Sequence, residues 1–191
     1  MRITILSFVF AAFIFNVSGA EFSRSSDFES VESFVAAAKS FEPITAKGDM
    51  SALFTVPEMG QPEDPKTGKP VAAPAIKSCD VLWGDDSFAL VFVLAEPQTE
   101  TTHSFVGVLF LLKQMKAHWQ IADTLRFTAA GKEANISAKL TAGTGTGYHL
   151  GSEGMFPVVT VAEWNGGRGY SNEISASYSF ISSKLKRLEL K

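Results

Sequence analysis

One carboxylate, Asp123, is in phase with an apolar strand face and is the first candidate for chemistry in this sequence. It alternates with apolar residues at two-residue spacing, namely Trp119, Ile121, Leu125 and Phe127. Side chains two residues apart share one face of a strand, so the pattern places Asp123 among apolar neighbours. Desolvation there would make the carboxylate a stronger base, which suits proton abstraction. A bulge, a strand end or a partner such as Arg126 would instead give Asp123 a structural role.

Histidines could complete such a site, and His103 and His118 are the candidate partners of Asp123. The chain has three histidines, the third being His149, and all of them fall in predicted loops or at strand ends. No second histidine or cysteine lies two or four positions from any of them, and Cys79 is the only cysteine. Metal sites need several such ligands at short spacing, so we predict no metal site and no cofactor.

The segment from Trp164 to Tyr170 is a second candidate, for binding rather than catalysis. It reads Trp-Asn-Gly-Gly-Arg-Gly-Tyr, and Asn165-Gly166 is the strongest hairpin-turn signal in the chain. A turn there would place Arg168 at an exposed tip between the rings of Trp164 and Tyr170, where it could contact a ligand or a partner protein. The alternative is a hairpin whose glycines only supply positive φ.

Four apolar runs of strand length must position these residues. They span 77–83, 88–95, 105–112 and 119–127, and polar breaks separate them, which predicts an antiparallel sheet. The second and third runs are apolar on both faces, so they should be central strands that are covered on both sides.

Helices are predicted before this sheet. Apolar residues at helical spacing indicate a helix over 28–41, and a shorter one follows over 50–56. Five of the eight prolines lie between residues 57 and 75, which predicts an extended loop.

The pattern after residue 127 predicts further strands. Residues 128–156 fit either a strand or a helix, and they end in a glycine-rich segment. Strands are predicted over 158–164, 170–180 and 184–190. In the middle one, Tyr178 and Phe180 belong to an apolar row, whereas Ser177 and Ser179 belong to a polar row that should face water.

A family resemblance rests on these sheet residues. The Trp83-Gly-Asp-Asp86 turn, the strand Val108–Lys113 and the closing Trp119-Gln-Ile-Ala-Asp123 resemble the sheet half of the nuclear-transport-factor-2-like (NTF2-like) superfamily over residues 28–127. The resemblance implies N-terminal helices packed on a strongly curved antiparallel sheet, with an apolar pocket between them. The predicted fold class is therefore α+β, with helix or helices on a curved sheet over 28–127 and a C-terminal antiparallel hairpin or meander over 128–191.

The N-terminus predicts export. Met1-Arg2 is followed by the apolar run Ile3–Val17 and by Ser18-Gly19-Ala20, which is typical of a secretory signal cleaved after Ala20. Residues 21–27 are polar and predicted to be disordered. We expect a secreted or periplasmic protein without a membrane span after cleavage. The net charge of −3 and the absence of a basic block before the C-terminal tail argue against nucleic-acid binding.

Two functions follow from these observations. The first is a non-catalytic module that binds a small ligand or a protein partner, which could be a second copy in a homodimer. The alternative is a small-pocket enzyme, such as an isomerase, dehydratase or hydrolase, with a buried Asp123 as general base.

Overall fold

The computed structural model describes residues 27–40, 51–54, 75–96, 104–142, 156–167 and 170–188. The predicted signal segment 1–20 lies outside the described residues. So do His103 and His149, most of the proline-rich segment and the glycine-rich segment 143–154.

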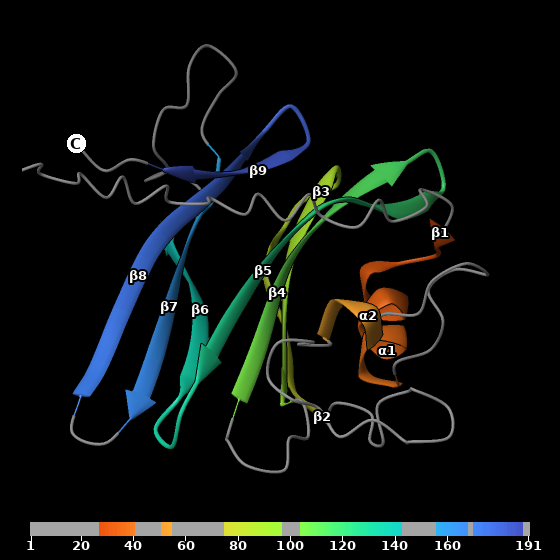
Figure 1. The fold of residues 1–191 in the computed structure, drawn as a ribbon. Helices are drawn as coiled ribbons and strands as arrows, with labels where there is room; N and C mark the ends of the chain where they lie inside the picture. The colour runs from red at the N-terminus through yellow and green to blue at the C-terminus, as the bar shows by residue number, and fades with distance from the viewer. Residues whose placement is uncertain are drawn as a thin grey trace, which may run out of the picture.

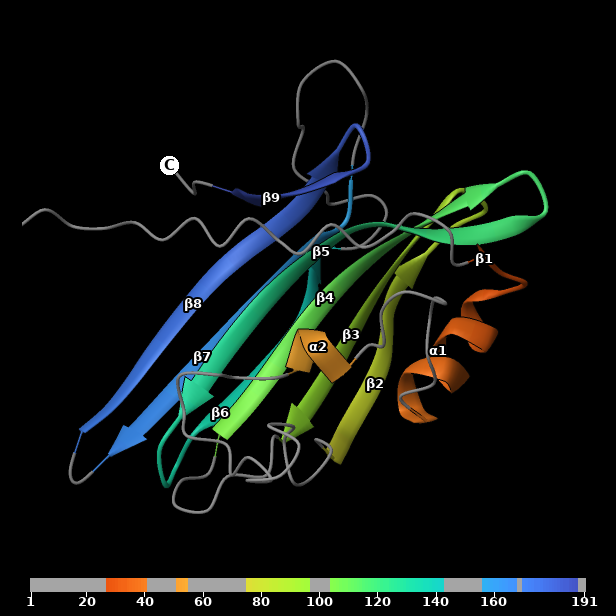
Figure 2. The same ribbon diagram turned by 45° about the vertical axis from the view of Figure 1, so that its right-hand side comes forward.

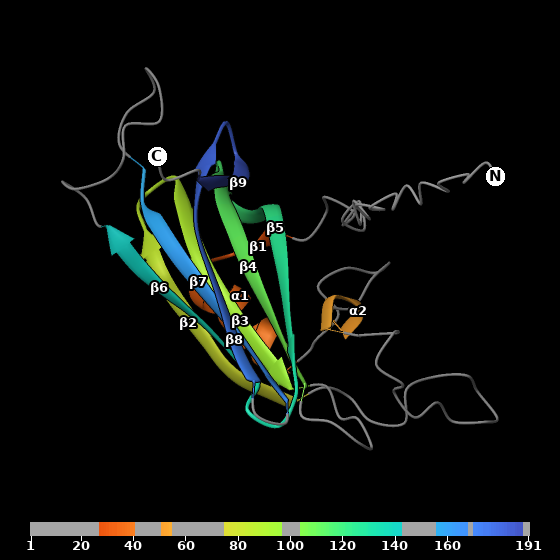
Figure 3. The same ribbon diagram turned by 60° about the vertical axis from the view of Figure 1, so that its left-hand side comes forward.

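Two antiparallel sheets form the body of the described protein (Figure 1). The five-stranded sheet has the order β1-β5-β4-β3-β2 and the four-stranded sheet the order β6-β7-β8-β9. The first consists of β1 (Asp27–Phe28), β2 (Ala75–Gly84), β3 (Phe88–Glu96), β4 (Ser104–Met115) and β5 (His118–Ala130). The second consists of β6 (Asn135–Ala142), β7 (Val158–Gly167), β8 (Tyr170–Ile181) and β9 (Lys184–Leu188). Figure 3 shows the sheets one behind the other, with β6 beside β2.

Two short helices lie on the outer side of the five-stranded sheet (Figure 2). They are α1 (Val31–Ser40) and α2 (Ser51–Phe54). Ser30 caps α1: its Oγ accepts a hydrogen bond from the Ser33 N–H at 3.2 Å, and the Ser33 Oγ accepts one from the Ser30 N–H at 3.1 Å. This reciprocal cap starts the helix later than predicted, because it satisfies the first backbone donors at Ser30.

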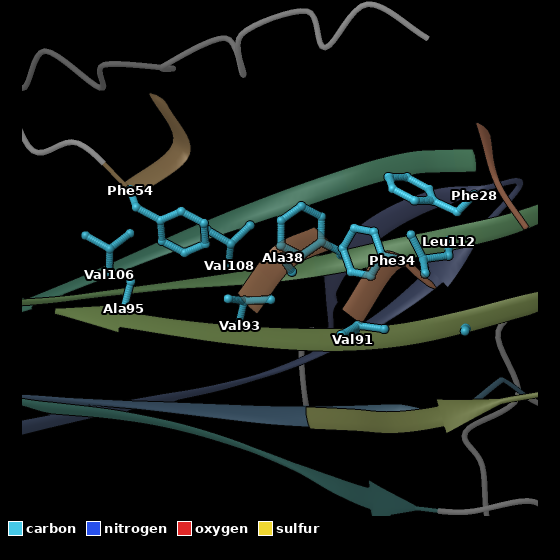
Figure 4. Packing of buried hydrophobic residues seen from close by; sticks show 12 residues of the cluster. Phe28, Phe34, Ala38, Phe54, Val91, Val93, Ala95, Val106, Val108 and Leu112 are labelled. Carbon is cyan, nitrogen blue, oxygen red and sulfur yellow. The ribbon is translucent and has the colours of Figure 1, made fainter. Parts of the chain in front are cut away.

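The central strands β3 and β4 are buried on both faces, as their apolar pattern predicted. On the helix side, Phe34, Phe54 and Phe110 are fully buried. Figure 4 shows Phe34 and Ala38 from α1 and Phe54 from α2 lying over the strands. The Phe34 ring packs edge-on against Phe110 at a centroid distance of 5.1 Å. The side of the sheet where the resemblance implies a pocket is thus lined by closely packed aromatic side chains.

The opposite face of the same sheet packs against the four-stranded sheet. This inter-sheet core consists of apolar residues from both sheets, including Leu90, Phe92, Leu109, Leu111, Phe127, Ile136, Val159, Val161, Phe180 and Leu185. Within it, three aromatic rings surround Phe180: the rings of Trp83, Phe88 and Phe156 all lie within 6.0 Å of its ring centroid.

The predicted α+β class is wrong. The protein is mostly β, and strands β6 to β9 form a second sheet stacked on the first, where the prediction had a C-terminal extension. The physical reason lies in the five-stranded sheet. Two short helices can bury only one of its apolar faces, and the apolar row of the C-terminal strands is buried against the other.

The polar row of β8 faces water only in part. Glu173 and Ser175 are exposed as predicted, whereas Ser177 and Ser179 are buried. The Ser179 hydroxyl donates to the Pro157 carbonyl at 2.7 Å, and Ser177 lies 3.2 Å from the Thr160 hydroxyl. Ile174, in the apolar row, is 48% exposed. Serine hydroxyls tolerate burial here because they find hydrogen-bond partners on the neighbouring chain segments.

Side chains join the two sheets along the free edge of β5. Among the described strands, β1 pairs with β5 only at Trp119 and Gln120, so the backbone donors farther along β5 lack a strand partner on that side. The Asn165 side-chain oxygen accepts a hydrogen bond from the Ala130 N–H at 3.0 Å, and Glu163 accepts one from the Thr128 N–H. Two residues of β7 therefore satisfy backbone groups that an additional strand would otherwise pair.

Candidate functional site

Asp123 has a structural role in this fold. In the register of β4 with β5, Leu111 pairs with Asp123 and Leu112 with Ile121, so Ala122 is an extra residue in a β-bulge. The bulge reverses the alternation: Trp119 and Ile121 contribute to the helix-side core, whereas Leu125 and Phe127 contribute to the inter-sheet core. The prediction of one shared apolar face is therefore wrong.

The contacts of Asp123 tie β9 to the five-stranded sheet. Its Oδ2 accepts a hydrogen bond from the Leu185 N–H at 2.8 Å, and its Oδ1 lies 3.6 Å from the Lys184 Nζ. The carboxylate thus substitutes for a strand at the outer edge of β9, as Asn165 does at the edge of β5. Through these contacts Asp123 positions the start of β9 against the five-stranded sheet.

The structure does not bring Asp123 together with a histidine in the part it describes. His118 is exposed at the start of β5, where it pairs with Met115. His103 lies outside the described residues. Within the described ranges, no group of three histidine, cysteine, aspartate or glutamate side chains could hold a metal ion.

The predicted turn at Asn165-Gly166 is wrong. Both residues lie inside β7, and the pairing with β8 continues beyond them to Gly167 opposite Tyr170. Gly166 instead meets Gly131 in an isolated parallel bridge beside the Asn165–Ala130 hydrogen bond. The turn preference of Asn165 and Gly166 is overridden here because both residues make contacts that join the two sheets.

The described residues do not show Trp164, Arg168 and Tyr170 gathered at one tip. Trp164 pairs with Glu173, three pairs away from Tyr170 opposite Gly167, and it is half-buried within β7. Arg168 and the side chain of Tyr170 lie outside the described residues. Ligand binding by this tip stays a prediction.

A cleft of about 340 Å³ opens at one end of the stacked sheets. We call it the mouth cleft, and its lining residues are Lys113, Met115, Gln120, Ile121, Ala122, Ser182, Ser183 and Lys184. The first five belong to β4 and β5, and the others to β9 and the turn before it. Figures 1 and 2 show the β4–β5 and β8–β9 turns at this end of the molecule. One wall thus comes from each sheet.

The β8–β9 turn at the cleft has an uncommon backbone. Ser182 and Ser183 have φ values of 51° and 62°, and they form the whole loop between the paired residues Ile181 and Lys184. Two positive φ values in a two-residue loop are typical of a type I′ turn, which normally uses Asn and Gly. Non-glycine residues in such conformations cost about 1–3 kcal/mol each, and such strain is concentrated at functional sites.

The mouth cleft combines cations, neutral polar groups and an apolar wall. Lys113 extends from β4 with its Nζ 5.7 Å from the centroid of the Phe88 ring, and Lys184 extends from the opposite wall. Two serine hydroxyls and the Gln120 amide add polar groups, and Met115 and Ala122 supply apolar surface. Lysine ammonium groups donate hydrogen bonds and do not accept them, so the set suits an anion.

Sequence reasoning missed these cleft residues. The sequence pattern places Lys113 at the start of a turn and Lys184 on a protected edge strand. The one usable sequence signal for the β8–β9 turn is the pair Ser182-Ser183, which separates the alternating apolar pattern of β8 from that of β9. The meeting of the two lysines depends on sheet stacking, which the local pattern does not encode.

Glu163 and Tyr178 form a titratable group between the sheets, near Arg187. Burial raises the pKa of Glu163 above its ordinary value, and the Thr128 N–H and Arg187 offset part of this rise. Burial likewise raises the pKa of Tyr178. Because the folded pKa of Glu163 is raised, its contribution to stability is full below the unfolded pKa near 4.5 and is lost as the pH rises through the folded pKa.

We therefore expect Glu163→Gln to be more stable than the wild type at pH 7. The glutamine side chain stays neutral and keeps an oxygen for the Thr128 N–H, so the gain should shrink as the pH falls below 4.5. Melting temperatures of both proteins between pH 4 and pH 8 measure it. Glu173→Gln, an exposed position on β8, is the matched control. Parallel pH profiles for the wild type and Glu163→Gln would contradict the prediction.

Cys79 is a free thiol on β2, half-buried against the helix-side core. Burial raises its pKa from 9.0 to about 11, although Lys39 acts in the opposite direction. Because the thiolate is the reactive form, this rise reduces the reactive fraction at pH 8 about a hundredfold. We expect a thiol-specific disulfide reagent to modify the native protein about a hundred times more slowly than the urea-unfolded chain. Equal rates in the two states would contradict this.

Comparisons of the chain with protein-family models, curated proteins and solved structures found no match. Among the described residues, neither helix has the length and apolar character needed to span a membrane. The function proposed below therefore rests on the residues of the mouth cleft.

Proposed function

We propose that this protein is a secreted or periplasmic, non-catalytic module that binds a small ligand in the mouth cleft. The observation that carries the proposal is the cleft itself, with one wall from each sheet and a lysine on each wall. Its volume of about 340 Å³ falls within the range of roughly 300–1,000 Å³ that small-molecule sites occupy.

The roles of the polar side chains support binding over catalysis. The carboxylate of Asp123 interacts with the Leu185 N–H and with Lys184, and so it maintains the position of β9. The described lining of the cleft has lysine, serine and glutamine as its polar residues. General base catalysis needs a proton acceptor within hydrogen-bond reach of the substrate, and these contacts give Asp123 another task.

An NMR screen tests this function. The ¹⁵N-labelled mature chain is titrated with a fragment set that contains anionic, cationic and neutral compounds. We expect saturable shifts at the amides of Gln120, Ser182, Ser183 and Lys184, because their residues line the cleft. Shifts confined to other surfaces, or no saturable shift with any fragment class, would refute the proposal.

Export is tested separately by the intact mass of protein recovered outside the cytoplasm. The Ser18-Gly19-Ala20 spacing predicts a mature N-terminus at Glu21. A recovered chain that retains residues 1–20 would remove the secretory part of the proposal and leave the ligand-binding part standing.

A further inference from the structure

We propose that the ligand of the mouth cleft is a small carboxylic acid with an apolar chain. The inference rests on the function proposed above and adds a ligand class to it. It is drawn from the charges at the cleft, the contacts of its two lysines and the distribution of its apolar surface.

The two lysines approach the cleft from different sheets. Lys113 belongs to the end of β4 in the five-stranded sheet, and Lys184 is the first residue of β9 in the four-stranded sheet. Their contacts leave ammonium protons for a ligand. Lys113 faces the Phe88 ring, and the 3.6 Å between Lys184 and Asp123 is longer than a charge-assisted hydrogen bond of about 2.7–2.9 Å.

The charge balance favours a monoanion. Two lysines and the adjacent Asp123 leave one net positive charge at the cleft. A carboxylate would neutralise this charge and could accept hydrogen bonds from the ammonium groups and the serine hydroxyls. A phosphate dianion would leave excess negative charge close to Asp123, where like charges repel.

The apolar wall determines the other part of the ligand. Met115 is 46% exposed at the cleft, and Ala122, which also belongs to the inter-sheet core, adds apolar surface to the same wall. Methionine adapts its shape to apolar partners of different size. Covering this wall would remove apolar surface from water, and acetate or another anion without a chain could not do so.

Asp123 is the positioning residue for this site. Its hydrogen bond to the Leu185 N–H holds the start of β9 against β5, and its Oδ1 lies beside the Lys184 ammonium. The Ala122 bulge directs the carboxylate to this side of the sheet. The strained Ser182–Ser183 turn then presents both hydroxyl residues at the same opening.

Three probes with matched structures test the ligand class by ¹⁵N NMR titration at pH 7. Octanoate has both the carboxylate and the chain, 1-octanol has the chain alone, and acetate has the charge alone. We expect octanoate to shift the cleft amides saturably and to bind about tenfold more tightly than either other probe, since each lacks one class of contact. Octanoate binding should weaken in about 0.5 M NaCl because salt screens exposed charges.

Lysine variants complete the test. Lys113→Ala and Lys184→Ala should each weaken octanoate binding about tenfold, the loss expected for a charge-assisted contact. Lys186→Ala is the matched control, because Lys186 lies on the same strand and does not line the cleft. Melting temperatures check folding, and Lys184→Gln replaces Lys184→Ala if the latter unfolds.

The outcomes separate this inference from the function beneath it. Equal binding of octanoate and 1-octanol in the cleft, or unchanged octanoate binding by both lysine variants, would refute the carboxylate and leave a ligand-binding module. No saturable shift of the cleft amides with any fragment or probe would refute both.

Discussion

Gly131→Ala is expected to destabilise the protein by about 4 kcal/mol or more, which is at the upper end for a single substitution. Gly131 has φ of +122°, which L side chains rarely adopt, and an added Cβ would lie 1.5 Å from the Gly166 carbonyl oxygen. That oxygen belongs to the backbone of β7, so relief of the clash requires the two sheets to separate at this point. Urea unfolding of the purified variant measures the loss.

Gly84→Ala is the matched control for this prediction. Its Cβ would meet Ala89 and Phe88 at 3.6 Å or more, which is ordinary van der Waals contact. We therefore expect its unfolding free energy to stay within about 1 kcal/mol of the wild type. If Gly131→Ala were as stable as Gly84→Ala, the close backbone contact between Gly131 and Gly166 would be contradicted.

Phe92→Ala and Phe110→Ala are each expected to lose about 3–5 kcal/mol of unfolding free energy. Phe92 is 2% exposed in the inter-sheet core, and Phe110 is 0% exposed in the core beneath α1. Each truncation removes buried apolar area and leaves a cavity that a closely packed sheet interface cannot fill. If either variant melted at the wild-type temperature, its phenylalanine would not be buried in the core to which it is assigned.

A double-mutant cycle tests the packing of Phe92 more sharply. A Cβ at Gly107 would lie 2.5 Å from the Phe92 Cζ, so Gly107→Ala should cost about 1–3 kcal/mol through overpacking. In a Phe92→Ala background this clash is absent, and the added methyl group partly fills the space. We expect the two losses to be less than additive by about 0.5–3 kcal/mol.

Gly107→Ala combined with Phe110→Ala is the control cycle. Gly107 faces the inter-sheet core and Phe110 the helix-side core, and so they do not share the Phe92 ring. Their losses should therefore add. Strong coupling in this cycle, or none in the first, would contradict the assignment of residues to the two faces of β4.

The central strands were predictable because their apolar residues occur on both faces. That pattern needs no knowledge of distant residues: a strand such as β4 exposes too much apolar surface unless both sides are covered. What covers the second side was not predicted. The second sheet covers it, and a strand pattern could not show this, since a run of alternating residues shows its own apolar face and not the surface that buries it.

Two local signals misled the prediction at the site for the same reason. Asp123 has the sequence phase of an apolar face, and the Ala122 bulge shifts that phase by one residue. Asn165-Gly166 has turn chemistry, and pairing through Gly167 and Tyr170 keeps it inside a strand. In both cases the pairing with a neighbouring strand outweighs a preference of about 1 kcal/mol in the local chain.

The sequence by itself determined the strand-forming runs, the two-sided burial of β3 and β4 and the single thiol at Cys79. These properties depend on residue type and two-residue spacing, which are local. Only the tertiary structure decided that Lys113 and Lys184 line one cleft, and that Asp123 and Asn165 cap strand edges. These contacts join residues far apart in the chain. They depend on how the two sheets stack and on where a bulge shifts the strand register.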